Sequence, residues 1–359
     1  MEIREGLLAE WVEQDAVILA FPNQNMDWRD NLEEVQECYR TIISEILEYT
    51  HVVLLLADEN EVPEGIEKFK ERFASKPHRL ILIDGFELND TWMRDVMPLF
   101  CIENGEKVAK DFGFNGWGLK FPANLDNTAV RRLFAQHHLF NDDVFLMPLQ
   151  SMVLEGGAVE TDGNGVIMTT DSVICEPNRN IHSENRDFQI EALSVTLGVD
   201  PLNIHSLKVH AMEGDDTDGH IDTLARFVDE DTIVYNYSEN SEDIHFELLQ
   251  SLRNEVENMR NSDSKKYKCV PLPVPAPIFD KEGQQLPATY ANFLITNGAI
   301  LVPTYGDSKD EEALNVLRGL KPDYQVVGID CRALIRQHGS LHCITMQVPQ
   351  GFIHPNHLK

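Results

Sequence analysis

Short apolar runs and segments of helical periodicity alternate along the whole chain. Runs of strand length occupy residues 16–21, 51–57, 79–84, 166–170, 232–237, 299–304 and 325–329. Between the first two runs, spacings of three and four residues predict a helix with one apolar face, formed by Leu32, Val35, Tyr39, Ile42, Ile43 and Ile46. Further helices are expected over residues 187–197, 243–259 and 311–320. The alternation predicts an α/β fold with mixed sheets, and several similar strand–helix–strand units would suit a pseudo-symmetric repeat.

The composition is that of a globular protein in a reducing compartment. Of the 359 residues, 42% are hydrophobic, which is enough for a sizeable core. The chain contains no apolar run long enough for a transmembrane helix, and its first residues lack the basic and apolar regions of a signal peptide. None of the six cysteines forms a Cys-x-x-Cys pair, which argues against a zinc ribbon or a dithiol redox site. We therefore expect a cytoplasmic protein with unpaired thiols.

The chain is strongly acidic. It has 60 acidic and 30 Lys or Arg residues, a formal net charge of −30. Such a charge repels nucleic acid and anionic membranes, so neither is an expected partner. Solubility alone accounts for the charge, and attraction of a cationic substrate is the functional alternative. The charge by itself does not decide between the two.

A candidate nucleophile is Cys343, which lies in Leu341–Thr345 directly after His338-Gly339-Ser340. A glycine turn leading into a short apolar strand would present a thiol to a pocket. Most free cysteines are simply small buried hydrophobes, so a catalytic role also needs a base. The adjacent His342 would face away from Cys343 on a strand. A distant histidine such as His220 is therefore the better candidate.

His220 and Asp222 occur in an acidic, glycine-containing segment, residues 214–222, before a predicted strand over residues 223–228. On a strand, side chains two residues apart point to the same face. The two residues could form an acid/base and binding pair. A metal site is the competing functional interpretation. The alternative without function is an acidic turn with one hydrogen-bonded histidine.

Two further segments carry unusual polar residues. Asn89–Asp95 combines two acids, an arginine and Trp92, which suits a polar pocket with an aromatic wall or, equally, a helix cap with a surface ion pair. Val153–Val159 places Glu155 among apolar residues, where an acid is seldom buried unless it is paired. The following pair of glycines permits close backbone approach. An edge-strand glutamate before a bulge is the structural alternative.

These segments belong to a longer series of motifs that extends along nearly the whole chain. The others are Ala9-Glu10-Trp11, Phe114-Asn115-Gly116-Trp117-Gly118, Asn178-Arg179-Asn180, Tyr290-Ala291-Asn292-Phe293-Leu294 and Val302-Pro303-Thr304-Tyr305-Gly306-Asp307. In this order the motifs resemble the agmatine deiminase and bacterial-type peptidylarginine deiminase family of the guanidine-modifying superfamily. One departure is Gln337-His338-Gly339-Ser340, which stands where agmatine deiminases carry a glycine-rich run.

The resemblance implies a five-bladed, pseudo-symmetric α/β propeller of the pentein type, with one catalytic domain over residues 1–359 and the active site on its central axis. It implies that Cys343 is the nucleophile, His220 the general acid/base and Glu155 the partner that orients His220. Asp95 and Asp222 would hold the guanidinium. No metal or organic cofactor is expected, and a homodimer is the assembly that the resemblance suggests.

The residue types fit chemistry at a guanidinium, which is planar and always charged at neutral pH. Burying a guanidinium costs several kcal/mol of desolvation free energy unless carboxylates pair with it. Cys343 would attack its central carbon, and His220 would protonate the departing ammonia. Hydrolysis of the resulting amidino-thioether then gives a ureido product. A thiol needs activation at neutral pH. Either His220 or the bound guanidinium could supply it.

The leading hypothesis for the substrate is agmatine, converted to N-carbamoylputrescine and ammonia on the route to putrescine and the polyamines. The alternative is a peptidylarginine deiminase that forms citrulline. Lower alternatives are a metal-dependent hydrolase that uses His220 and Asp222, and a non-enzymatic polyamine-binding protein. Asp216, with its neighbour Asp215, could bind the distal ammonium of agmatine or belong to a solvated turn. Trp92 and Trp117 could line the aliphatic chain or serve as core aromatics.

Overall fold

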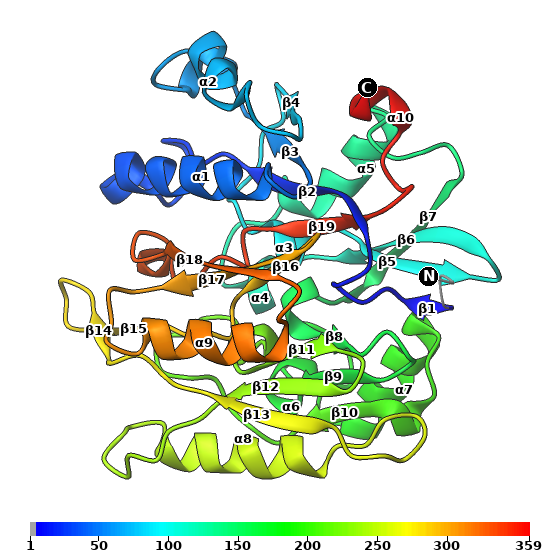
Figure 1. Ribbon diagram of the computed structural model, residues 1–359. Helices are drawn as coiled ribbons and strands as arrows, with labels where there is room; N and C mark the ends of the chain where they lie inside the picture. The colour runs from blue at the N-terminus through cyan, green and yellow to red at the C-terminus, as the bar shows by residue number, and fades with distance from the viewer. Residues whose placement is uncertain (1–4) are drawn as a thin grey trace.

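The computed structural model describes residues 5–359, and within this range the strands form six sheets (Figure 1). Two sheets have four strands: β1 (Gly6–Leu7), β5 (Leu99–Glu103), β6 (Glu106–Gly113) and β7 (Val144–Val153); and β19 (Met346–Pro349), β2 (Gln14–Ala20), β3 (His51–Leu55) and β4 (Leu80–Ile83). Three have three strands: β10 (Ile204–Leu207), β9 (Ile167–Thr170) and β8 (Glu160–Thr161); β11 (Ala225–Asp229), β12 (Thr232–Asn236) and β13 (Lys268–Leu272); and β16 (Leu294–Thr296), β17 (Ala299–Thr304) and β18 (Gln325–Asp330). The sixth is the hairpin of β14 (Ile278–Phe279) and β15 (Gln285–Leu286).

The five larger sheets share one pairing pattern. In each, an antiparallel pair is followed by a parallel pair, as in β16–β17–β18 and β11–β12–β13. The same order recurs in β8–β9–β10, β5–β6–β7 and β19–β2–β3. A parallel pair requires a crossover connection, and each crossover here contains a helix. These helices are α1 (Leu32–Ile46), α5 (Ala129–Ala135), α7 (Arg186–Leu197), α8 (Phe246–Asn258) and α9 (Asp310–Leu320). The α/β fold with mixed sheets predicted from the sequence is therefore confirmed.

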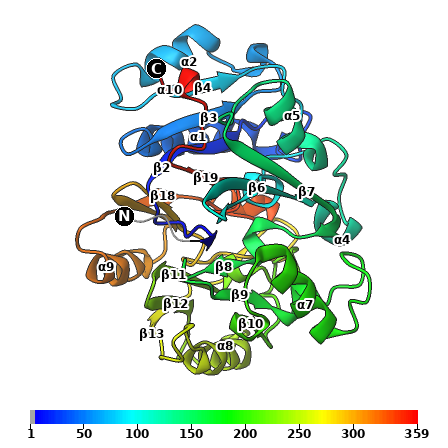
Figure 2. The same ribbon diagram turned by 90° about the vertical axis from the view of Figure 1, so that its right-hand side faces the viewer.

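The crossover helices bury one face against the sheets. In α1 the predicted apolar stripe is buried as expected, including Val35, Tyr39 and Ile42. Each such side chain contributes roughly 1.5–3 kcal/mol of burial free energy. In both views α7, α8 and α9 lie on the outside of the molecule (Figures 1 and 2). One large apolar cluster includes residues from most of the sheets, and a second surrounds β11–β13 and α8. The single domain expected from the sequence stays a prediction.

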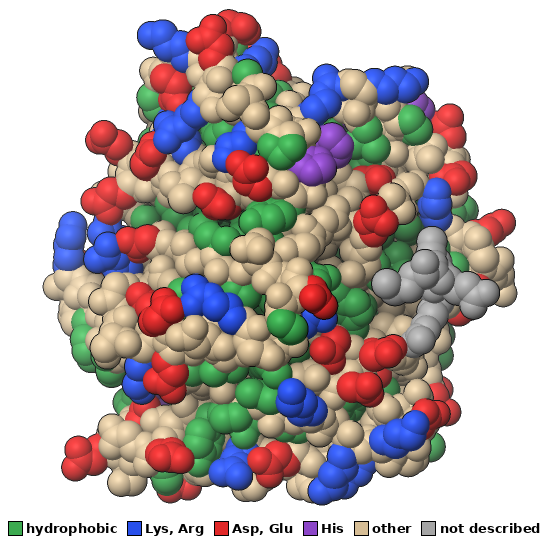
Figure 3. Space-filling view, viewed as in Figure 1, with side chains coloured by type: hydrophobic (Ala, Val, Ile, Leu, Met, Phe, Trp, Pro, Cys, Tyr) green, Lys and Arg blue, Asp and Glu red, His purple; other side chains and the backbone are tan. Residues whose placement is uncertain are grey.

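The remaining helices are short. They are α2 (Ile66–Phe73), α3 (Met93–Val96), α4 (Gly116–Leu119), α6 (Asp171–Ile174) and α10 (Pro355–Leu358). The 3₁₀ helices are η1 (Arg29–Asn31), η2 (Glu59–Glu61), η3 (Asp126–Thr128), η4 (Gly156–Ala158), η5 (Pro201–Asn203), η6 (Ile221–Thr223) and η7 (Ile335–Gln337). Across residues 5–359 no helix combines the length and apolar character needed to cross a membrane. Acidic side chains are spread over the face seen in Figure 3, with Lys and Arg among them.

The strand prediction for two candidate segments was wrong. His220 precedes η6 rather than lying on a strand, and β11 begins only at Ala225. The side chain of Thr223 donates to the carbonyl oxygen of His220 at 2.8 Å, a local bond that favours a turn over an extended strand. Cys343 likewise lies in a turn before β19, which begins at Met346. The side chains of these two segments therefore do not alternate between the faces of a strand.

Candidate active site

Each of the five larger sheets places one polar side chain just before its first antiparallel strand. The five residues, with the strand that follows each, are Asp95 before β5, Glu155 before β8, Asp222 before β11, Asn292 before β16 and Cys343 before β19. Each of these residues lies two to five positions before the strand named with it. The repeated topology thus brings residues from distant parts of the sequence to one place.

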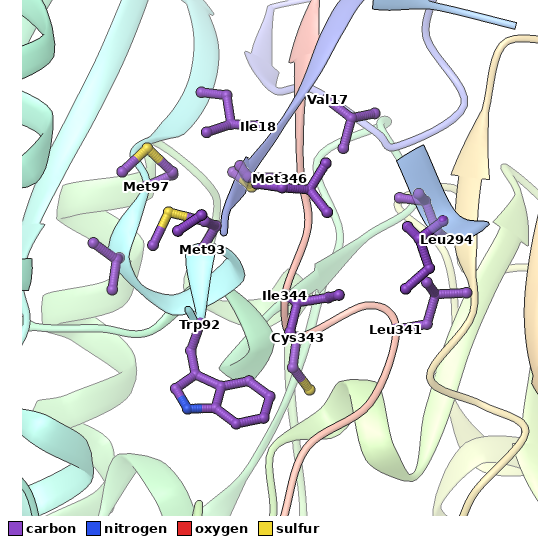
Figure 4. Close-up of a cluster of buried hydrophobic side chains, with 14 of the residues drawn as sticks. Val17, Ile18, Trp92, Met93, Met97, Leu294, Leu341, Cys343, Ile344 and Met346 are labelled. Atoms are coloured by element: carbon purple, nitrogen blue, oxygen red, sulfur yellow. The ribbon is translucent and has the colours of Figure 1, made fainter. Parts of the chain in front are cut away.

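Cys343 lies at the edge of the apolar core. Its side chain and the ring of Trp92 point away from Ile18 and Met346, as Figure 4 shows. The residue is only 5% exposed. Its Sγ lies 3.7 Å from Oδ2 of Asp222 and 3.2 Å from Nδ2 of Asn292. The thiol is therefore held next to one carboxylate and one amide donor.

Asn292 has a fixed amide orientation. Its Oδ1 accepts a hydrogen bond from the backbone N–H of His342 at 2.9 Å and lies 3.4 Å from the backbone nitrogen of Cys343. Those two donors hold the oxygen toward the turn, so Nδ2 is the atom available to donate to the sulfur. Asn292 appeared in the sequence only as part of a motif, without an assigned role.

Asp222 is fully buried and presents its two oxygens differently. Oδ2 accepts a hydrogen bond from Nδ1 of His342 at 2.8 Å, whereas Oδ1 has no hydrogen-bond partner among the described residues. Burial works to raise the pKa of Asp222, but the bond from His342 and nearby positive charges outweigh it and hold the pKa below its usual value. Asp222 is therefore an ionised acceptor with one oxygen available.

Asp95 is the second buried carboxylate near the thiol. Its Oδ1 accepts the backbone N–H of Gly157 at 2.9 Å, and its Oδ2 accepts the indole N–H of Trp117 at 3.0 Å. Burial, together with the charges of Asp222 and Glu155, raises the pKa of Asp95 to about 6. At neutral pH Asp95 is thus mostly ionised, and a bound cation would stabilise that form further.

His220 lies between these groups. It is 1% exposed, and neither ring nitrogen has a hydrogen-bond partner among the described residues. Its Nδ1 is 3.6 Å from Oδ1 of Asp95. A side chain carbon placed on Gly157 would lie 2.7 Å from that Nδ1, 2.9 Å from Asp95 Oδ1 and 3.0 Å from Asp222 Oδ2. Gly157 therefore marks the point where the imidazole and both carboxylates converge.

Glu155 is buried as the sequence suggested, and its partner is Arg179. The Nε of Arg179 donates to both carboxylate oxygens at 2.9 and 3.1 Å. The same guanidinium reaches Asp218 Oδ2 at 2.7 Å and the carbonyl oxygen of Thr217 at 2.9 Å. Arg179 thus connects Glu155 to the turn that carries His220. The expected role of Glu155 in orienting His220 stays a prediction.

A cavity of about 1030 Å³ leads to the thiol. Its lining includes Cys343, Asp95, Trp92, Trp117 and Asp216, so the two tryptophans are both buried and at the cavity wall. The lining is strongly acidic, with eight carboxylates: Asp27, Asp58, Glu61, Glu87, Asp90, Asp95, Asp126 and Asp216. Against these, the positively charged or titratable basic residues of the lining are Arg29 and His338. The cavity is suited to a cation.

Asp215 and Asp216 have different surroundings. The carboxylate of Asp215 accepts hydrogen bonds from Thr217 and from the backbone N–H of Gly219, so it stabilises the turn before His220. Asp216 lines the cavity, and burial raises its pKa to about 6. Of the pair, Asp216 is the one placed to meet a ligand.

A comparison with family models shows to which protein family the chain belongs. The family model of the Porphyromonas-type peptidyl-arginine deiminase matches residues 6–349. The chain belongs to this family. The resemblance found in the sequence motifs is therefore confirmed.

Solved structures of similar deiminases cover nearly the whole chain. One from Porphyromonas gingivalis, named a Putative Arginine Deiminase, is 45% identical with a TM-score of 0.88, covering 98% of this chain and 100% of the other. The agmatine deiminase of C. jejuni with substrate bound is 32% identical with a TM-score of 0.85, covering 97% of both chains. The agmatine deiminase of Enterococcus faecalis is 26% identical with a TM-score of 0.83, covering 97% of this chain and 96% of that one.

The deiminase site also contains features that sequence reasoning missed. Asn292 is one, because an amide before an apolar strand has no distinctive local signal. Arg179 is another, since nothing in the sequence connects it to Glu155. The signal that could have found Asn292 is positional: it precedes the first strand of its unit, as Cys343 and Asp222 do.

Proposed function

We propose that this protein is an agmatine deiminase, which hydrolyses agmatine to N-carbamoylputrescine and ammonia on the route to putrescine. The observation that carries the proposal is the buried end of the acidic cavity. Cys343 and Asp95 line the cavity there. The thiol lies beside Asp222, and Asp222, Asp95 and His220 converge at Gly157. A cation between two carboxylates, within reach of a sulfur nucleophile, is what deimination of a guanidine requires.

The two carboxylates would hold the guanidinium in a defined plane. Asp222 offers Oδ1, which has no partner among the described residues, and Asp95 offers a carboxylate already oriented by Trp117 and Gly157. A guanidinium presents several N–H donors in a fixed plane, so paired acceptors fix its orientation. The central carbon would then face Cys343.

The substrate itself would activate the thiol. Burial and the charges of Asp222 and Asp95 raise the pKa of Cys343 well above its usual value, so the thiol is protonated in the free enzyme. A guanidinium bound between the two carboxylates neutralises their effect and adds a positive charge next to the sulfur. Asn292 Nδ2 donates to the sulfur and would stabilise the thiolate. Of the two activators open from the sequence, this arrangement favours the guanidinium.

The reaction would proceed in two steps. The thiol gives its proton to His220, and the thiolate attacks the central carbon of the guanidinium. The bond to one terminal nitrogen then breaks as His220 donates that proton to the nitrogen, which leaves as ammonia. An amidino-thioether remains on Cys343. His220 then removes a proton from water, the resulting hydroxide attacks the same carbon, and the carbon–sulfur bond breaks. His220 returns the proton it took from water to the sulfur, which is again a thiol, and the protonated product loses a proton to solvent and leaves as the ureido compound. Glu155, held by Arg179, would support the turn and the charge of His220.

The cavity lining favours agmatine over substrates that carry a carboxylate. Agmatine has a second positive charge at its distal end, and Asp216 is the cavity carboxylate proposed to bind it. Trp92 and Trp117 would flank the aliphatic chain. Free arginine or a C-terminal arginine would bring a carboxylate into a cavity lined by eight acids and one arginine, and the repulsion would oppose its binding.

Peptidylarginine is the second candidate because the cavity is larger than agmatine requires and the family model is that of a peptidyl-arginine deiminase. The experiment that separates the two compares kcat/KM for agmatine, free arginine and peptides with internal or C-terminal arginine. We expect agmatine to exceed each of the others by about 100-fold or more. An arginyl peptide that is turned over faster than agmatine would overturn the substrate assignment and leave the deiminase chemistry in place.

The lower alternatives have distinct tests. Among residues 5–359, the one group of three His, Cys, Asp or Glu with ligand atoms close together is Glu10, Glu160 and His342, so His220 and Asp222 do not form such a cluster. Activity that survives chelation without bound metal would exclude a metal-dependent hydrolase. A polyamine-binding protein without activity would show no preference of a haloamidine probe for Cys343 over Cys331.

We further propose that the five larger sheets form the blades of a pseudo-symmetric α/β propeller. Their common pairing pattern and the similar positions of the site residues support this arrangement. A reducing, cytoplasmic compartment is also proposed, and six free cysteines support it. The homodimer suggested by the family resemblance stays a prediction, which sedimentation of the purified protein would check.

A further inference from the structure

Glu10, from the Ala9-Glu10-Trp11 motif, has no part in the chemistry above. It lies in the loop between β1 and β2, and its side chain is mostly buried. The carboxylate contacts four side chains from other parts of the chain: Arg94, Arg226, His342 and Gln347. Arg94 directly precedes Asp95, and His342 directly precedes Cys343. Glu10 is therefore bonded to the immediate neighbours of two site residues.

His342 bridges Glu10 and Asp222. Its Nε2 lies 2.6 Å from Oε1 of Glu10, and its Nδ1 lies 2.8 Å from Oδ2 of Asp222. The ring is buried, and its backbone N–H donates to Asn292. A histidine held by a carboxylate at each nitrogen has little freedom to rotate. The bridge contacts the Asp222 carboxylate through Oδ2, and neither Glu10 nor His342 lines the cavity.

The bond from His342 determines how Asp222 faces the site. With Oδ2 bound by Nδ1, the plane of the carboxylate is fixed, and Oδ1 is the oxygen without a partner among the described residues. Without that bond the carboxylate could turn, or pair Oδ1 with another donor. A bidentate grip on a planar guanidinium depends on that orientation.

The guanidinium of Arg226 supplies a positive charge between the carboxylates of Glu10 and Glu160. Arg226, fully buried on β11, donates through Nε to Glu160 and through Nη2 to Glu10. Glu10, Glu160 and His342 are close enough to resemble a metal site, but the Arg226 guanidinium already bonds both carboxylates. The cluster is therefore organised around an arginine, and Glu10 also contacts His342, Arg94 and Gln347.

We propose that His342, held from its far side by Glu10, is a positioning residue that fixes the Asp222 carboxylate for guanidinium binding. Burial, Arg226 and Arg94 lower the pKa of His342, whereas Glu10 and Asp222 favour its charged form. Because both carboxylates accept hydrogen bonds, the ring donates from Nδ1 to Asp222 and from Nε2 to Glu10. The inference rests on the proposed function, since the guanidinium is its ligand.

The test measures guanidinium binding without turnover. In a Cys343→Ala background, agmatine and methylguanidine are titrated by calorimetry into proteins with His342→Leu, His342→Asn or no further change. Leu removes the donor, whereas Asn retains an N–H near the position of Nδ1. We expect His342→Leu to weaken binding of both probes by about tenfold or more and His342→Asn to recover most of that loss. His205→Leu is the matched control. His205 lies on β10 and is bonded to the carbonyl oxygen of Arg260, so its replacement should leave binding of both probes unchanged.

The outcomes separate the two proposals. Equal binding by the Leu variant and the parent, or equal loss in the Leu and Asn variants, would overturn the positioning role. If the Leu variant does not fold, Glu10→Gln decides: loss of its charge should weaken both probes severalfold, and unchanged binding would overturn the role. A Cys343→Ala parent that binds neither guanidine would instead overturn the proposed function, on which this inference rests.

Discussion

At the residue scale, the ionisable groups around Cys343 are shifted in opposite directions. Asp222 has a lowered pKa because His342 donates to it, whereas burial raises the pKa of Asp95 to about 6 and that of the thiol well above its usual value. One carboxylate is therefore ionised at any pH near neutrality. The other carboxylate titrates close to neutrality, and the raised pKa keeps the thiol protonated in the absence of a bound cation.

This difference predicts the acid limb of the pH profile. Protonated Asp95 cannot pair with a guanidinium, so kcat/KM should fall as the pH drops through about 6. The indole of Trp117 donates to Asp95 Oδ2 and favours the ionised form. Trp117→Phe removes that bond, which raises the pKa of Asp95 and moves the acid limb to higher pH.

The profile is measured as kcat/KM for agmatine against pH in the parent and the Trp117→Phe protein. Trp11→Phe, outside the cavity lining, serves as the control and should leave the limb in place. An acid limb that stays at the same pH in Trp117→Phe would show that Asp95 does not set it.

At the element scale, the short helix η4 passes through the centre of the site. Its Gly157 donates a backbone N–H to Asp95, and its missing side chain leaves space for His220 and both carboxylates. A methyl group there would lie within 3.0 Å of all three side chains. The glycine is thus required by close packing, because its φ is not in the left-handed region.

Gly157→Ala should therefore displace the catalytic groups while the fold persists. We expect kcat/KM to fall by about 100-fold or more, as for a displacement of about 1 Å at a reacting centre. Overpacking should cost about 1–3 kcal/mol of stability. Steady-state kinetics and thermal unfolding measure the two effects.

Gly319→Ala is the matched control, since nothing lies within 4 Å of a methyl group at this position in α9. It should keep full activity and add up to about 1 kcal/mol of helix stability. Gly157→Ala with parental kcat/KM would contradict the observed convergence of the three side chains.

The sequence predicted the elements better than the loops. The strand over residues 299–304 has the predicted bounds, and α1 begins and ends with its apolar stripe. Those segments form because one face of each is buried, and the spacing of apolar residues in the sequence shows which face that is. The turn at His220 was missed because it depends on two hydrogen bonds that leave no periodic pattern: the backbone N–H of His220 donates to Thr217 Oγ1, and Thr223 Oγ1 donates to the carbonyl oxygen of His220.

The sequence predicted those site residues whose side-chain type suggests a particular chemical role. A cysteine, a histidine and isolated acids are conspicuous in sequence, and the structure brings Cys343, His220, Asp95 and Asp222 together. Asn292, Glu10 and Arg179 were not assigned roles, because their importance comes only from contacts between sheets. Such contacts depend on tertiary arrangement and cannot be inferred from spacing.

At the scale of the whole molecule, charge and cavity act together. The chain has a formal net charge of −30, and eight acidic residues line its cavity. We expect such a charge distribution to attract a cationic substrate toward the cavity and so to raise its association rate. The same field discourages substrates that carry a carboxylate.

Added salt should therefore lower kcat/KM, which includes substrate association, more than it lowers kcat. Between low ionic strength and about 0.15 M salt, where the screening length is about 8 Å, kcat/KM for agmatine should fall severalfold while kcat changes little. Asp58→Asn combined with Glu61→Gln, two changes at the cavity lining away from the thiol, should reduce this dependence. A kcat/KM that does not respond to salt in the parent would contradict electrostatic capture.

The most direct test of the account is the mass of the enzyme quenched with acid during turnover of agmatine. The account predicts a covalent adduct whose mass equals agmatine less ammonia, located on Cys343 by peptide mapping and absent from Cys343→Ala, which should release no ammonia. Turnover by Cys343→Ala, or an adduct on a different cysteine, would contradict it.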